Sequence, residues 1–119
     1  MSTASNIAIT LVALIHVYIL VLEMFLWDKP AGLRAFGHTQ QAATASKVLA
    51  ANQGLYNGFL AAGLFWSLTQ GADGFHAALF FLTCIAIAGI YGAITASRKI
   101  LFVQTVPAVI ALVLIHFPK

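Results

Sequence analysis

Long apolar stretches, separated by a small number of charged residues, constrain this chain more than any other feature. Only 8% of its 119 residues are charged, whereas an ordinary globular domain has about 25%. The hydrocarbon core of a bilayer is about 30 Å thick, so a helix that crosses it needs about 20 residues. We therefore expect a membrane protein with four crossings and no extramembrane domain.

The expected fold is all-α, a single transmembrane domain over residues 1–119 that forms an integral membrane four-helix antiparallel bundle. The expected spans cover about residues 7–27, 48–69, 75–96 and 100–117. The first span lacks a basic segment before it and a small-residue cleavage site after it, which favours a retained helix over a signal peptide. About residues 28–46 form the one long polar connection.

Basic residues are distributed unevenly between the two sides of this expected bundle. The first and third connections hold Lys29, Arg34, Lys47, Arg98 and Lys99, whereas the other side has only Lys119. By the positive-inside rule, those two connections are cytoplasmic and both termini are on the non-cytoplasmic side. The sequence thus predicts a multi-pass protein of the plasma membrane, which is the inner membrane in a Gram-negative cell.

Proline, glycine and capping residues mark where helices are expected to stop, start or bend. Pro30 and Gly32 are expected to break the helix after the first span. Thr39 is placed to cap a helical lead-in that covers residues 40–47. Pro107 lies inside the fourth span, where it removes a backbone donor, so we expect a kink there, either alone or lining a pocket.

Small residues recur at the spacing that lets membrane helices approach closely. Gly54 and Gly58 form a GxxxG pattern, and Ala88, Gly92 and Ala96 follow one another at intervals of four. Such residues pack the helices of one chain or form the seam of a homo-oligomer. The pattern favours packing within one chain and leaves a homo-oligomer as the alternative.

Polar side chains inside the expected spans are the candidate functional residues. A charge at the centre of a bilayer costs about 2.5–3.5 kcal/mol on insertion scales, so each one needs a reason. The candidate ligand-binding residues are His16, Glu23, Asn52, Gln53, Asn57, Tyr91 and Gln104. Counted along each helix, most of them fall in the cytoplasmic half of the membrane, with His16 deeper. We therefore expect a polar pocket that opens toward the cytoplasm.

Each of these residues also has a purely structural interpretation. Glu23 lies close enough to the interface to pair with Lys47 or Arg34. The amides can act as interhelical hydrogen bonds worth about 0.6 kcal/mol each. Asn52 with Tyr56, and Gln53 with Asn57, have the i, i+4 spacing of one polar stripe.

Several kinds of function find no support in the residues. Amide oxygens are poor zinc ligands, so His16 and Glu23 predict no metal site, and no cofactor is expected. The six Lys and Arg residues are too dispersed for a nucleic-acid surface. Cys84 is the one cysteine and lies in an apolar run, so no intrachain disulfide can form.

Several sequence segments together resemble a known family. They are LEMFLW at residues 22–27, KVLAANQGLYNGFLAAGL at 47–64, AGIYGA at 88–93 and KILFVQ at 99–104, followed by Pro107 and Ala108. The chain is similar over nearly its whole length to the small four-helix membrane proteins of domain of unknown function 1304. The resemblance implies an integral membrane fold and no established activity.

Three hypotheses from different classes follow from these patterns. In the first, which the polar residues favour, the protein binds or transports a small molecule, and Glu23 exchanges a proton or pairs with a cation. In the second, it is a membrane-embedded enzyme acting on a lipophilic substrate, an isomerase or hydrolase with Glu23 and His16 as acid and base. In the third, the polar groups satisfy one another and the protein is a packed scaffold subunit. The bilayer, an unknown small molecule and a homo-oligomer are the expected partners.

Overall fold

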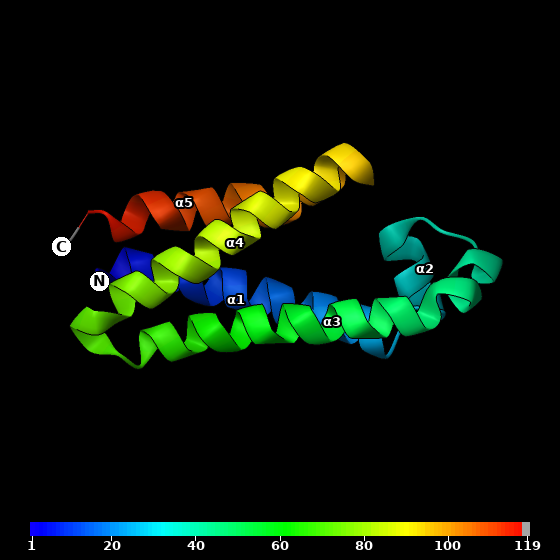
Figure 1. The fold of residues 1–119 in the computed structure, drawn as a ribbon, viewed down its shortest axis with the longest axis horizontal. Coiled ribbons are helices and arrows are strands. Elements are labelled where there is room, and N and C mark those ends of the chain that lie inside the picture. Colours follow the sequence, from blue (N-terminus) through cyan, green and yellow to red (C-terminus); the bar gives the residue numbers. More distant parts are fainter. Residues whose placement is uncertain (118–119) are drawn as a thin grey trace. The chain divides into compact units, whose positions relative to one another are not determined.

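The computed structural model describes residues 1–117 and folds them into helices, with no β-strand among these residues (Figure 1). The α-helices are α1 (Thr3–Met24), α2 (Pro30–Phe36), α3 (Gln40–Leu68), α4 (Gly74–Thr95) and α5 (Val106–Ile115). A 3-10 turn, η1 (Gly71–Asp73), precedes α4, and a π-helical segment, η2 (Leu101–Thr105), precedes α5. The all-α expectation is confirmed, while Lys119, used in the charge argument, lies outside the described residues.

Within residues 1–117, two helical segments are long and apolar enough to cross a membrane, namely Thr3–Met24 and Gly71–Thr95. Leu101–Ile115 is a shorter apolar helix. Helix α3 has 29 residues but starts with the polar segment that precedes Val48 and carries three amides further along. Most residues of each of the four expected spans are thus helical, while length and apolar composition together identify two of these segments as able to cross a membrane.

The chain divides into two compact units, each of which is described by itself. The first unit combines Met1–Ile15 with Leu60–Lys119, and the second unit is His16–Phe59. The first unit contains the beginning of α1, the end of α3, and α4 and α5. The second contains the end of α1, all of α2 and the larger part of α3.

An apolar core holds the first unit together. Its buried members are Ile9, Val12, Ala13, Leu64, Ala78, Leu82, Ile85, Ala86, Ala108, Ala111 and Ile115. Alanine is frequent among them because small side chains let helix backbones approach closely. The buried Ser5 hydroxyl donates to the carbonyl oxygen of Leu114 at 3.2 Å, which joins α1 to the end of α5.

Helices α4 and α5 lie side by side as a hairpin (Figure 1), and Gly89 of α4 packs directly against Thr105 of η2. A Cβ atom at Gly89 would overlap the hydroxyl and backbone nitrogen of Thr105. That hydroxyl donates to the carbonyl oxygen of Ala86 at 3.0 Å. The sequence predicts a kink before Pro107, and the structure has the π-helical segment there. The Val106 N–H reaches back five residues to the Leu101 carbonyl, which is the π-type bond.

Glycines also set the packing of α1 against α3 in the second unit. A Cβ atom at Gly54 would lie 2.6 Å from Met24 Cγ, and one at Gly58 would lie 2.6 Å from Leu20 Cδ1. Neither position has room for a side chain unless its neighbour moves. The GxxxG pattern therefore packs helices of the same chain at this point.

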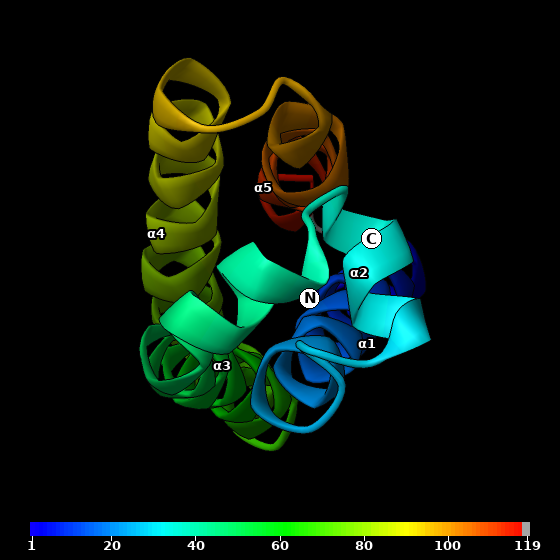
Figure 2. The same ribbon diagram turned by 90° about the vertical axis from the view of Figure 1, so that its right-hand side faces the viewer.

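The polar connection between α1 and α3 is more helical than the sequence predicts, because it contains α2 (Figure 2). Pro30, expected to break a helix, instead occupies its first turn, where the missing N–H is not needed. Gly37 ends α2 in the left-handed conformation at φ 66°. The predicted cap of α3 is confirmed, since the Ala42 N–H donates to Thr39 Oγ1 at 3.1 Å.

Candidate functional site

A hydrogen bond between two buried polar side chains connects α1 and α3 within the second unit. Asn57 Nδ2 on α3 donates to Glu23 Oε1 on α1, with 2.6 Å between the two atoms. Glu23 is 3% exposed and Asn57 is 6% exposed. The close approach at Gly54, whose missing Cβ would lie 3.1 Å from Glu23 Cβ, brings the two helices near enough for this bond. The structure thus joins two candidate residues that are 34 positions apart.

The Glu23 carboxyl accepts a hydrogen bond from an amide and forms no ion pair with Lys47. Lys47, one of the cations considered for Glu23, instead pairs with Asp28, with 3.1 Å between Nζ and Oδ2. This contact with Lys47 holds the pKa of the Asp28 carboxyl below its ordinary value of 3.8, and Lys29 adds to the effect. Among the described residues, the polar contact of the Glu23 carboxyl is the one with Asn57. The buried carboxyl therefore has a donor but no ion-pair partner there.

His16 is also on α1 and is fully buried. It precedes Glu23 by seven residues, so the two lie on one face of the helix with their Cα atoms about 10 Å apart. Direct proton transfer across such a distance requires a water or a substrate to bridge the side chains. The acid and base pair of the enzyme hypothesis therefore needs a third participant.

The remaining amides of α3 occupy a different environment from Asn57. Asn52 and Gln53 are exposed, as is Tyr56, whose exposed fraction is 63%. The buried positions of this part of α3 are instead Ala43, Ala50, Gly54 and Asn57, which follow the three-and-four spacing of one helix face. The expected polar stripe is thus divided between a packed and an exposed side of α3.

Tyr91 and Gln104 belong to the first unit. Tyr91 is 70% exposed on α4. Gln104 is half-buried and lies in the π-helical segment η2. Irregular helix of this kind is frequent at functional positions, so Gln104 stays a candidate ligand-binding residue.

An aromatic cluster at the start of the α1–α3 connection was not anticipated from the sequence. The ring of Trp27 lies 4.7 Å from that of Phe36 and 4.3 Å from that of His38, centroid to centroid. Trp27 Nε1 donates to Ser46 Oγ at 3.1 Å, and His38 Nε2 donates to the Trp27 carbonyl at 3.3 Å. Trp27 thus contacts both α2, through Phe36, and the beginning of α3, through Ser46. The signal for this cluster in the sequence is the presence of Phe36 and His38 shortly after Trp27, in the connection that follows α1.

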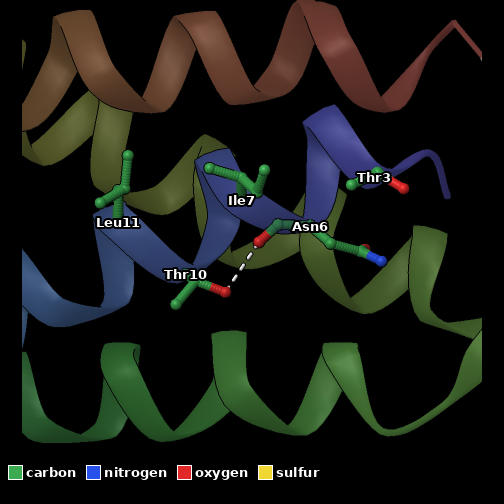
Figure 3. Close-up of a pocket in the computed structure, with 5 residues that line it drawn as sticks. All are labelled: Thr3, Asn6, Ile7, Thr10 and Leu11. Carbon is green, nitrogen blue, oxygen red and sulfur yellow. Dashed lines mark hydrogen bonds between the residues drawn. The ribbon is translucent and has the colours of Figure 1, made fainter.

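Surface grooves occur at other places in the first unit. Figure 3 shows one along α1, lined by Thr3, Asn6, Ile7, Thr10 and Leu11. The Thr10 hydroxyl donates to the Asn6 carbonyl at 2.7 Å. A second groove is lined by Met1, Ala72, Phe75, Ile115 and His116. Across the described residues, three or more His, Cys, Asp or Glu side chains nowhere gather as a metal site would need.

The helices and their apolar composition define an all-α helical bundle with two segments suited to crossing a membrane. The chain belongs to the family described as protein of unknown function (DUF1304), whose model matches residues 10–116. It is also 31% identical over 105 residues to the uncharacterized protein YpaA of Lactococcus lactis subsp. lactis (strain IL1403). That match covers 87% of this chain and 88% of the relative. No solved structure matches the chain.

Proposed function

We propose that this protein is a multi-pass protein of the plasma membrane in which α1, α3, α4 and the η2–α5 segment cross as an antiparallel four-helix bundle. Large apolar side chains exposed on these helices support the proposal, for example Leu11 at 56%, Ile87 at 62% and Ile110 at 54%. Water-soluble monomers rarely expose apolar surface of this extent. In this proposal, the basic connections lie in the cytoplasm and both termini lie on the other side of the membrane, in agreement with the positive-inside rule.

Labelling of single cysteines tests this topology. In a Cys84→Ser background, one cysteine is introduced at Gln40, Asp73 or Ser97, three exposed positions in or directly next to separate connections. A membrane-impermeant maleimide added to intact cells is expected to label the cysteine at position 73 and to reach the other two only after lysis. Equal labelling of all three in intact cells contradicts four antiparallel crossings.

Within this framework, the protein binds a small molecule at an intramembrane polar site centred on Glu23. The observation that carries this function is the buried carboxyl of Glu23, which has the Asn57 amide as its donor while Lys47 pairs with Asp28. A buried carboxylate without a countercharge is costly, so it favours a proton or a cationic group on a ligand. The ligand class is therefore a small molecule with a cationic or hydrogen-bond-donating group.

The other candidate residues have defined roles in this proposal. Asn57 orients the carboxyl, and His16 on the same face of α1 extends the polar site deeper into the membrane. Asn52, Gln53, Tyr91 and Gln104 stay sequence-based predictions for contacts with the ligand. Transport of the ligand requires a homo-oligomer, because four short helices enclose little volume.

Binding is tested by thermal unfolding of the detergent-solubilised protein against a panel of small organic ammonium compounds and uncharged analogues of the same shape. We expect at least one ammonium compound to raise the unfolding temperature of the wild type and not of Glu23→Gln. Asp28→Asn is the matched control, because it removes one carboxylate outside the spans. Stabilisation that persists in Glu23→Gln contradicts the assigned role.

A scaffold subunit is the second candidate, and one observation favours it. Among the described residues, no buried side-chain nitrogen or oxygen lacks a hydrogen-bond partner. A site that is already satisfied can serve packing alone. On this alternative, Glu23→Gln changes stability and no compound of the panel distinguishes it from the wild type.

A further inference from the structure

The beginning of α3 changes abruptly from a polar to an apolar exposed surface. Gln40, Gln41 and Thr44 are exposed, and so is Lys47, whose side chain is 56% accessible. The next two residues, Val48 and Leu49, are exposed at 76% and 73%. In a membrane helix, this change marks the level at which headgroups give way to acyl chains. Lys47 therefore lies at headgroup level.

Two cations lie near one carboxylate at this level. Lys47 pairs with Asp28, and Lys29 is close enough to act on the same carboxyl. The three side chains together carry one excess positive charge. Lys29 and Lys47 are both exposed, so the charge is open to a ligand.

The aromatic cluster of Trp27, Phe36 and His38 lies beside this charge along the chain. Trp27 directly precedes Asp28, and its indole donates to Ser46, the neighbour of Lys47. Indole rings of this kind lie at the level of the headgroups in membrane proteins. Charge, aromatic rings and the apolar boundary thus coincide within one part of the second unit.

We propose that Lys29 and Lys47 bind the phosphate of an anionic phospholipid, with the acyl chains running along Val48 and Leu49. The proposal rests on the membrane embedding proposed above. The charge complementarity is direct, because the two ammonium groups exceed their one carboxylate by one charge. The exposed apolar residues that follow Lys47 supply the surface for the chains.

The test measures lipid selectivity in phosphatidylcholine vesicles with reconstituted protein. Spin-labelled phosphatidylglycerol and spin-labelled phosphatidylcholine are compared for the fraction immobilised by the protein. The wild type is expected to prefer phosphatidylglycerol. Lys29→Gln and Lys47→Gln are each expected to lower that preference by about fivefold, the effect of one cation beside an anionic lipid.

Two control variants separate this site from general surface charge. Arg34→Gln removes an exposed cation of the same connection on α2 and is expected to leave the preference within about twofold of the wild type. Asp28→Asn is expected to raise the preference, which a misfolded variant would not do. Equal losses in Lys47→Gln and Arg34→Gln, or a loss in Asp28→Asn, overturn the proposal.

Vesicle flotation distinguishes failure of the lipid site from failure of the membrane proposal. Protein that floats with phosphatidylcholine vesicles but shows no phosphatidylglycerol preference overturns the lipid site alone. Protein that does not float with the vesicles overturns both proposals.

Discussion

Removal of the Asn57 amide is expected to destabilise the fold through Glu23. Leaving a buried hydrogen-bonding group without its partner costs about 1–3 kcal/mol, whereas side-chain hydrogen bonds between membrane helices average about 0.6 kcal/mol. The short distance of 2.6 Å and the burial of both partners place this bond in the upper range. We expect Asn57→Ala to lower the free energy of unfolding by about 2 kcal/mol.

A double-mutant cycle isolates the pairwise part of this effect. Asn57→Ala and Glu23→Ala, alone and combined, are expected to show a coupling free energy of about 1 kcal/mol. Unfolding in mixed micelles, followed by circular dichroism, supplies the four free energies. Asn52→Ala, which removes an exposed amide of the same helix, is the control and should change the stability by less than about 0.5 kcal/mol. A coupling indistinguishable from zero refutes the argument.

Three further predictions concern packing, capping and pH. Gly89→Ala is expected to destabilise the α4–α5 hairpin by about 1–3 kcal/mol, because the backbone nitrogen of Thr105 cannot move away from the new methyl group; an unchanged unfolding temperature would refute this. Thr39→Ala removes the cap of α3 and should cost about 1 kcal/mol, measured by chemical unfolding. The lowered pKa of Asp28 means that its pair with Lys47 stabilises the fold at neutral pH, and this stabilisation is lost as pH falls below 3.8 toward the folded pKa. The stability difference between wild type and Lys47→Gln should accordingly shrink in acid, and a constant difference would contradict it.

The helices could be predicted to different degrees from the sequence. Apolar length alone predicts α1 and α4, whose ends differ from the expected ones by three or four residues in α1 and by one residue in α4. The start of α3 at Gln40 follows from a different signal, because Thr39 as a cap and the helix propensity of residues 40–47 indicate a helix there without apolar length. Pro30 predicts a helix break, although the same residue is compatible with the first turn of α2, where the structure has it.

The candidate site could be predicted as residues but not as contacts. Glu23 and Asn57 were evident as polar side chains in apolar runs, yet nothing local specifies that they meet. Their contact depends on the rotation of α1 against α3, which the glycines at 54 and 58 set by admitting Leu20 and Met24. The sequence offers Lys47 as a partner for Glu23, but in the structure Lys47 pairs with Asp28, which follows the end of α1.

A high-resolution structure of the protein in a lipid bilayer tests the central claim most directly. The account predicts non-protein density within hydrogen-bonding distance of the Glu23 carboxyl, in helices that cross the bilayer. A Glu23 carboxyl enclosed by Asn57 and apolar side chains, with no space for another molecule, would contradict the binding function and favour the scaffold.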